Sequence, residues 1–415
     1  MKATRLAQFL ACASLLTVPA AAHDQSADWM QIMKAELQRA AASVNKAYAE
    51  FLKAHPSMVA QTPPDHNGHA TGNPVIHPKE ERPAVTDDLV FSKLTRTVPV
   101  AQDNGRDPVG AFRFLCGPGH LAYNDPLVYP GQEGASHLHQ FFGNLEADHN
   151  STYESLRKSG DSTCMNPLNR SAYWIPALLT GKGTVHTPER LVVYYKALPS
   201  SDPFYSRSGT ELAQLPRGLA YVFGWDANRK HKKHWRPVNF RCIVKGSNRE
   251  VKGTMRKALD ACAEKGGELI AGTHSPSCWN GKDMTASDQR SHLRYEKRNQ
   301  RGEVICPKGF DKVLPAFSLQ ATYAIEKGSD VSGYEFASDH MVPAKWREPG
   351  YSFHADWFGA WNDETLRRWH EGCIEAHRNC SDGNLGDGTK MKWEVPYPHT
   401  RPVAERFVPI PKRPG

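Results

Sequence analysis

The stretch RLVVYYKAL at residues 190–198 shows the pattern that decides the fold of this chain, a short apolar run between polar turns. Runs rich in Val, Tyr, Phe and Trp favour β-strands. Similar runs, broken by glycine, proline and asparagine, recur from about residue 100 to 395: AFRFLC (111–116), YWIPALL (173–179), GLAYVFGW (218–225), NFRCIV (239–244), ELIAGT (268–273) and FSLQATYAI (317–325). We therefore expect a mainly β, sandwich-like domain with long loops stapled by disulfides.

Three stretches of the domain have helical patterns instead, at residues 151–160, 251–267 and 362–380. The first opens with Ser151 and Glu154, spaced as in a capping box. The domain should therefore contain a few short helices.

The chain outside this domain divides into four further segments. Residues 1–22 combine Lys2 and Arg5 with an apolar run and small residues, which predicts a signal peptide and a secreted protein, extracellular or periplasmic. Residues 23–55 have the spacing of an amphipathic helix, and residues 56–100 the composition of a disordered linker. A domain at 101–395 and a proline-rich tail at 396–415 complete the expected organisation, with the helix and linker outside the core.

Charge and hydropathy exclude two classes of partner. The chain has 52 Lys and Arg against 44 Asp and Glu among 415 residues, a net charge of +8 that is too weak to predict nucleic-acid binding. Beyond the signal, no stretch has the roughly 20 apolar residues of a membrane-spanning helix. The sequence leaves the oligomeric state open.

Cysteine usage agrees with an oxidising compartment. Once Cys12 leaves with the signal, an even number of cysteines remains, with no CxxC pair: residues 116, 164, 242, 262, 278, 306, 373 and 380. These predict four disulfides rather than a zinc ribbon. The local pairs Cys373–Cys380 and Cys278–Cys306 are the expected ones.

Several motifs together resemble a known family of secreted fungal and bacterial proteins. They are DPLVYPGQEGASHLHQFFGN (125–144), SAYWIPALL (171–179), SPSCWNG (275–281), SHLRY (291–295), CP (306–307) and SFHADWFGAWNDETLRRWHEGC (352–373). In this order they are similar to the domain of unknown function DUF1996, over roughly residues 107–384. The resemblance implies no reaction, but it implies a polysaccharide setting. Asn280 stands where the family pattern has an aspartate.

Histidines in these motifs predict a metal site. If residues 136–144 form a strand, His137 and His139 share one face about 6.5 to 7 Å apart and can converge on one cation. His292, His354 and Asp356 are the further candidate ligands, for a transition metal such as zinc or copper. His137, His139 and Asp356 are also the candidate catalytic residues. The alternative is that these residues line a sugar groove or bond to nearby backbone.

Aromatic residues in the same motifs suggest a glycan groove, because sugar rings stack on indole and phenol rings. Trp279, Trp357, Asn280 and Tyr173 are the candidate substrate-binding residues. Core packing is the better explanation for each aromatic taken singly, except Trp279, which lies in a loop-like setting between Cys278 and Asn280-Gly281. Two functions stay open. One is a metal-dependent enzyme, hydrolytic or oxidative, that acts on polysaccharide, and the other is a non-catalytic polysaccharide-binding or metal-binding module.

Overall fold

The computed structural model describes residues 77–414, apart from 228–236, 248, 299–303 and 396–401. The expected signal peptide, the amphipathic helix at 23–55 and the linker as far as residue 76 lie outside the described residues. Within the described part of the chain, no helix is long and apolar enough to cross a membrane.

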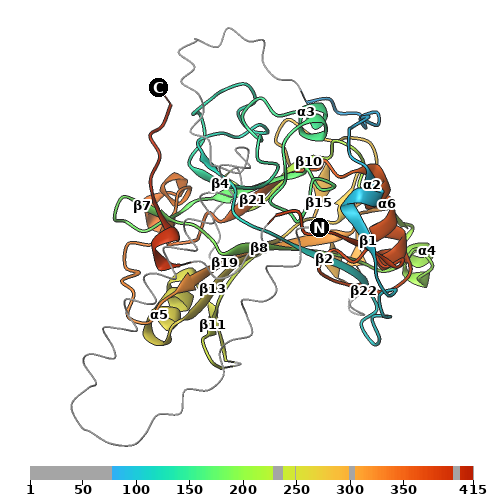
Figure 1. Ribbon diagram of the computed structural model, residues 1–415. Helices are drawn as coiled ribbons and strands as arrows, with labels where there is room; N and C mark the ends of the chain where they lie inside the picture. The colour runs from blue at the N-terminus through green and yellow to red at the C-terminus, as the bar shows by residue number, and fades with distance from the viewer. Residues whose placement is uncertain (1–76, 228–236, 248, 299–303, 396–401, 415) are drawn as a thin grey trace, which may run out of the picture. The chain divides into compact units, whose positions relative to one another are not determined.

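A seven-stranded sheet forms one layer of the domain (Figure 1). Its neighbours are antiparallel except β2 and β22, which are parallel. The strands in spatial order are β12 (Glu250–Gly253), β11 (Val238–Val244), β13 (Gly267–His274), β19 (Ala316–Ile325), β8 (Arg190–Ala197), β2 (Gly110–Cys116) and β22 (Asn379–Cys380). In β8, buried and partly exposed residues alternate, so one face of this sheet packs inward.

A five-stranded sheet forms the second layer. In spatial order it contains β10 (Ala220–Gly224), β21 (His354–Phe358), β5 (Ala172–Pro176), β4 (His139–Gly143) and β3 (Leu121–Ala122). Every residue of β4, β5, β10 and β21 is buried, so both faces of this sheet are covered.

The core lies between these two sheets. The rings of Phe114 on β2 and Tyr173 on β5 are 6.3 Å apart, and those of Phe317 on β19 and Trp357 on β21 are 5.2 Å apart. All four side chains belong to one buried cluster. The predicted mainly β, sandwich-like fold is therefore confirmed.

A second cluster covers the outer face of the five-stranded sheet. Phe141 and Trp174 of this sheet lie there with Leu127 and with Tyr153 and Leu156 of helix α3 (Tyr153–Lys158). The capping box of α3 is formed by Thr152 and Ser155, one residue later than expected, because each side chain accepts the backbone N–H of the other.

The other elements are short. One four-stranded sheet contains, in spatial order, β15 (Leu293–Arg294), β14 (Cys278–Trp279), β18 (Lys312–Val313) and β9 (Glu211–Leu212). Another contains β20 (Glu335–Phe336), β6 (Leu178–Leu179), β7 (Thr184–His186) and β24 (Phe407–Pro409). Two-stranded sheets join β1 (Thr95–Thr97) to β23 (Thr389–Met391) and β16 (Lys297–Arg298) to β17 (Val304–Ile305). The helices besides α3 are α2 (Phe91–Leu94), α4 (Pro203–Ser208), α5 (Met255–Lys265), α6 (Asp363–Trp369), the π-helical η4 (His370–Glu375), and the 3-10 turns η2 (Asp339–Met341), η3 (Ala344–Trp346) and η5 (Val403–Glu405).

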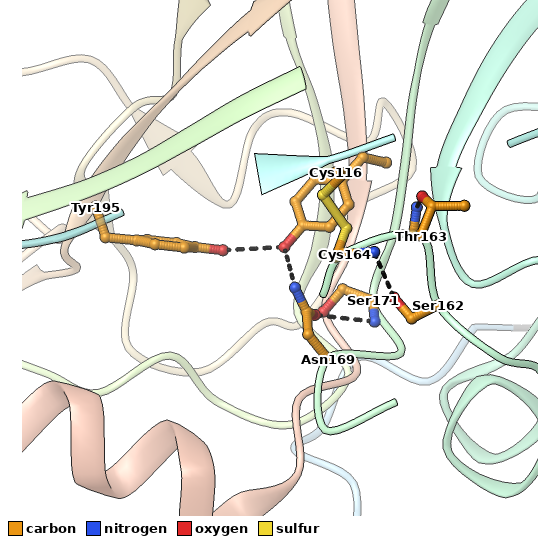
Figure 2. The surroundings of a disulfide bond; sticks show 9 residues. Cys116, Ser162, Thr163, Cys164, Asn169, Ser171 and Tyr195 are labelled. Carbon is orange, nitrogen blue, oxygen red and sulfur yellow. Dashed lines mark hydrogen bonds between the residues drawn. A yellow bond between two sulfur atoms is a disulfide. The ribbon is translucent and has the colours of Figure 1, made fainter. Parts of the chain in front are cut away.

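Four disulfides join Cys116 to Cys164, Cys242 to Cys262, Cys278 to Cys306 and Cys373 to Cys380. The two local pairs predicted from the sequence are confirmed. Figure 2 shows Cys116–Cys164 beside Asn169, whose side-chain oxygen accepts the backbone N–H of Ser171. This disulfide ties β2 of the large sheet to the loop before β5.

Two segments expected outside the domain pair with it. β1, in the expected linker, pairs with β23, and β24, in the expected tail, pairs with β7. Each has three residues, too few to show a hydrophobic period, and prolines near β24 favour a loop by composition.

Candidate metal centre

Three histidines from two strands of the five-stranded sheet meet on its outer face. His139 begins β4, His354 begins β21, and His137 precedes β4 by two residues. One ligand nitrogen from each lies within 4.8 Å of the others, and no other such group of histidine, cysteine or acidic residues occurs in the described chain. The ring centroids are 4.2 Å apart for His137 and His139, 5.1 Å for His137 and His354, and 6.0 Å for His139 and His354.

Backbone carbonyls orient two of the three imidazoles. Nδ1 of His139 lies 3.0 Å from the carbonyl oxygen of Asn124, and Nδ1 of His354 lies 2.8 Å from that of Ser352. Because a carbonyl only accepts, each Nδ1 carries the proton, and each Nε2 keeps its lone pair. A hydrogen bond from the other ring nitrogen to a carbonyl is typical of histidines that bind metals.

The nitrogens that face the centre lack protein partners. Nε2 of His137 and Nε2 of His139 are buried, and neither has a hydrogen-bond partner among the described residues. Buried polar atoms are normally paired, so these two atoms indicate a ligand. His139 and His354 are buried, whereas His137 is partly exposed. The centre is therefore reached from the side of His137.

Burial keeps the imidazoles neutral. It lowers the pKa of His139 to about 3 and that of His354 to about 4. The pKa of His137 is well below its usual value, first because of burial and then because of the neighbouring His139 and His354. Neutral imidazole is the form that binds a metal ion, so no proton needs to leave at neutral pH.

One buried carboxyl group, Asp356, lies beside the histidines, and a second, Asp125, interacts electrostatically with Asp356. Oδ2 of Asp356 is 3.7 Å from Nε2 of His354, and neither oxygen of Asp356 has a hydrogen-bond partner in the described part of the chain. Burial raises the pKa of Asp356 well above its usual value, Asp125 raises it further, and the Arg290 guanidinium opposes this. Burial also raises the pKa of Asp125 to about 6, against the N–H groups of Val128 and Leu127.

His292, predicted as a ligand, does not join this group. It is 1% exposed, and its ring lies 6.2 Å from that of Tyr221, a residue of the interior cluster. A position inside a family-like motif does not place a side chain at the same point in space. The group that could hold a metal ion is His137, His139 and His354, with Asp356 adjacent.

Trp357 and Tyr173, predicted to hold substrate, are in the core. They are 1% and 0% exposed and point toward the seven-stranded sheet. Successive side chains of a strand point to opposite faces, so Trp357 lies opposite to His354 and Asp356. A sugar ring cannot stack on either aromatic here.

Trp279 lies on β14 and Asn280 follows it, and the backbone N–H of Asn280 donates to the carbonyl oxygen of His292 at 3.1 Å. Trp279 is 7% exposed, and its Nε1 donates to the carbonyl oxygen of Asp283 at 2.8 Å. Asn280 donates to the Asp283 carboxylate at 2.7 Å and accepts the backbone N–H of Asp283 at 3.0 Å. Both residues shape a turn, and their contact with a glycan stays a prediction.

The residues that sequence reasoning missed are those that orient the ligands. Asn124 and Ser352 act through backbone carbonyls, which carry no side-chain signal. Arg290, one residue before the SHLRY motif, influences both Asp356 and Asp125 electrostatically. Its position before a family-like motif is the only sequence signal that it offers.

These features define a class of protein: a disulfide-bonded β-sandwich with three convergent histidines on the outer face of one sheet. The model of the family described as "Domain of unknown function (DUF1996)" matches residues 125–361, more than half of the chain, and includes all three histidines. The chain belongs to this family. No curated protein and no solved structure matches it.

Proposed function

We propose that the domain binds one transition metal ion, zinc or copper, through His137, His139 and His354. The observation that carries this proposal is the convergence of three imidazoles within 4.8 Å, two of them with Nδ1 held by backbone carbonyls. Imidazole nitrogens are softer ligands than the oxygen atoms that calcium and magnesium prefer, so three histidines suit zinc or copper.

The ligand set favours catalysis over a structural role. Structural zinc sites have four protein ligands, whereas catalytic sites have three and keep one position for water or substrate. Asp356 lies 3.7 Å from Nε2 of His354, so it would lie beside an ion held by that nitrogen. A bound ion would supply Lewis acidity toward a water or substrate oxygen, and Asp356 would hold or release a proton beside it.

We further propose that the substrate is a polysaccharide of the extracellular or periplasmic space, cleaved hydrolytically or oxidatively. Four disulfides support an oxidising compartment. Burial of Trp357 and Tyr173 removes two aromatics of the expected groove. The alternative is a non-catalytic module that holds metal or polysaccharide.

Metal content tests the first proposal. Protein purified without a histidine tag and reloaded with zinc or copper should hold about one equivalent by elemental analysis. The His139→Ala variant should hold almost none. His292→Ala is the matched control, since it removes a buried histidine outside the group, and it should hold as much metal as the wild type. A wild type that stays metal-free, or equal loss in both variants, contradicts the proposal.

Product analysis tests the second. The metal-loaded protein is incubated with neutral and acidic polysaccharides, and new reducing or oxidised ends are measured. Products that disappear in His139→Ala support an enzyme. Retention on the polymer without product supports the binding module instead.

A further inference from the structure

The end of the chain is fixed against the domain near the metal centre. β24 pairs with β7, and the buried pair Arg406–Glu189 has an N–O distance of 2.9 Å. After β24, the backbone N–H of Ile410 donates to Gly183 at 3.1 Å. We call residues 402–414 the C-terminal strap.

The last residues of this strap contact the loop that supports the centre. The guanidinium of Arg413 lies 4.6 Å from the ring centre of Tyr123, and its Nη1 donates to the carbonyl oxygen of Gly134 at 3.3 Å. The N–H of Gly134 donates in turn to the side chain of Asn124, whose carbonyl orients His139.

Gly134 allows this close approach. Its φ is +73°, and an added Cβ would lie 3.1 Å from the carbonyl oxygen of Pro414. The loop and the end of the strap therefore pack directly on each other.

An exposed cation, Arg413, lies against the loop that leads to His137. Arg413 is exposed, and no carboxylate of the described residues lies within ion-pair distance of it. Tyr123, over whose ring the guanidinium lies, accepts the backbone N–H of Ser136 at 3.2 Å, so Arg413 packs on a residue bonded to the neighbour of His137. His137 is the partly exposed histidine of the three, and the guanidinium lies against the loop that leads to it.

We propose that Arg413 makes the metal centre select ligands that carry an anionic oxygen group, a carboxylate or a phosphate. A guanidinium presents a planar fork of N–H donors that matches both groups, and one of its nitrogens remains bound to Gly134. This inference rests on the proposed metal site, because the ligand is bound between the metal and Arg413.

The test compares three probes by calorimetry on the zinc-loaded protein: galacturonate, inorganic phosphate and neutral galactose. Galacturonate or phosphate should bind at least about tenfold more tightly than galactose, and Arg413→Gln should weaken that binding about tenfold. Lys412→Gln is the matched control, because it removes the neighbouring exposed cation of the same strap. It should bind the anions within about twofold of the wild type.

Zinc content, measured in every variant, separates this inference from the proposed function. If the wild type holds no zinc, the metal site itself is refuted. If zinc is held but galactose binds as well as the anions, or Arg413→Gln binds them as well as the wild type, only the role of Arg413 is refuted. Binding of galacturonate alone identifies a carboxylate ligand, and binding of phosphate alone identifies a phosphate ligand.

Discussion

Asp339→Asn should both destabilise the domain and weaken the metal centre. Asp339 is fully buried. Its Oδ2 accepts the N–H of Phe336 at 2.9 Å and of Gly350 at 2.8 Å. Its Oδ1 accepts the N–H of Ser352 at 3.0 Å and the hydroxyl of Ser352 at 2.6 Å. Ser352 is the residue whose carbonyl orients His354.

The magnitude follows from the count of acceptors. If the asparagine NH₂ faces the N–H groups of Phe336 and Gly350, two hydrogen bonds are lost. If it faces Ser352, the bond from the Ser352 N–H is lost, whereas the hydroxyl can rotate to accept. One or two hydrogen bonds to a charged group are lost, at about 1.5 to 3 kcal/mol each, so we expect a loss of about 1.5 to 6 kcal/mol. Displacement of the Ser352 carbonyl should also lower metal affinity about 10-fold to 100-fold.

Stability is measured by urea unfolding of the metal-free, disulfide-intact protein at pH 7. Metal affinity is measured separately, by competition between the folded protein and a zinc chelator. Asp330→Asn is the matched control, since Asp330 accepts the N–H and hydroxyl of Ser332 in the same way but is exposed. Its stability and affinity should stay close to the wild type. A loss below about 1 kcal/mol for Asp339→Asn refutes the reasoning, since surface substitutions change stability by less than that.

Three further predictions concern stability. Replacing Cys116 and Cys164 by alanine opens a loop of 48 residues and should cost about 4 kcal/mol in urea unfolding; an unchanged midpoint contradicts this. Gly143→Ala places a Cβ 2.0 Å from the carbonyl oxygen of Ser171 at φ +81° and should cost about 3 kcal/mol, so a variant as stable as the wild type rules out this geometry. Burial lowers the pKa of His292 to about 4. Below pH 6.5 the unfolded chain binds a proton that the folded chain does not, so stability is kept above pH 6.5 and falls toward pH 4, by about 2 kcal/mol at pH 5. The stability of His292→Gln should fall less between pH 6.5 and pH 5 than that of the wild type. Identical pH profiles of stability for the variant and the wild type contradict this prediction.

The sandwich and two of its disulfides were predictable because they depend on local pattern. Alternation within runs such as 190–198 gives strands with one inward face. Cys278–Cys306 and Cys373–Cys380 are near in sequence. Cys116–Cys164 joins β2 to a loop that tertiary packing brings beside it, and no spacing rule selects it.

The metal centre was predictable where strand alternation applies and unpredictable elsewhere. His137 and His139 are two residues apart, the spacing that strand alternation requires, although only His139 lies within β4. The same rule puts Trp357 on the face opposite to His354. A prediction that treats this segment as a strand therefore cannot place both side chains in one groove. His292 needed the folded structure, because its distance from the other histidines depends on the packing of a loop.

Pro176 explains why histidines on two strands that are not neighbours can meet. β4 and β21 both flank β5, so two strand spacings, about 9.6 Å, separate their backbones. Yet the rings of His139 and His354 are only 6.0 Å apart, so they lean toward each other above β5. Pro176 pairs with His139, and the β21 register, continued by two residues from Asp356 opposite Trp174, places Pro176 beside His354 as well.

The next set of cross-strand neighbours on the same face, Phe141, Trp174 and Asp356, is packed differently. There Trp174 fills the space above β5, stacked on Phe141 with ring centroids 5.4 Å apart, and it separates Phe141 from Asp356. A large β5 residue thus gives a packed core, and a short proline ring leaves room for imidazoles to converge. Proline also lacks the N–H that continued pairing with β21 would use. The centre therefore depends on the residue between the two histidine strands as much as on the histidines themselves.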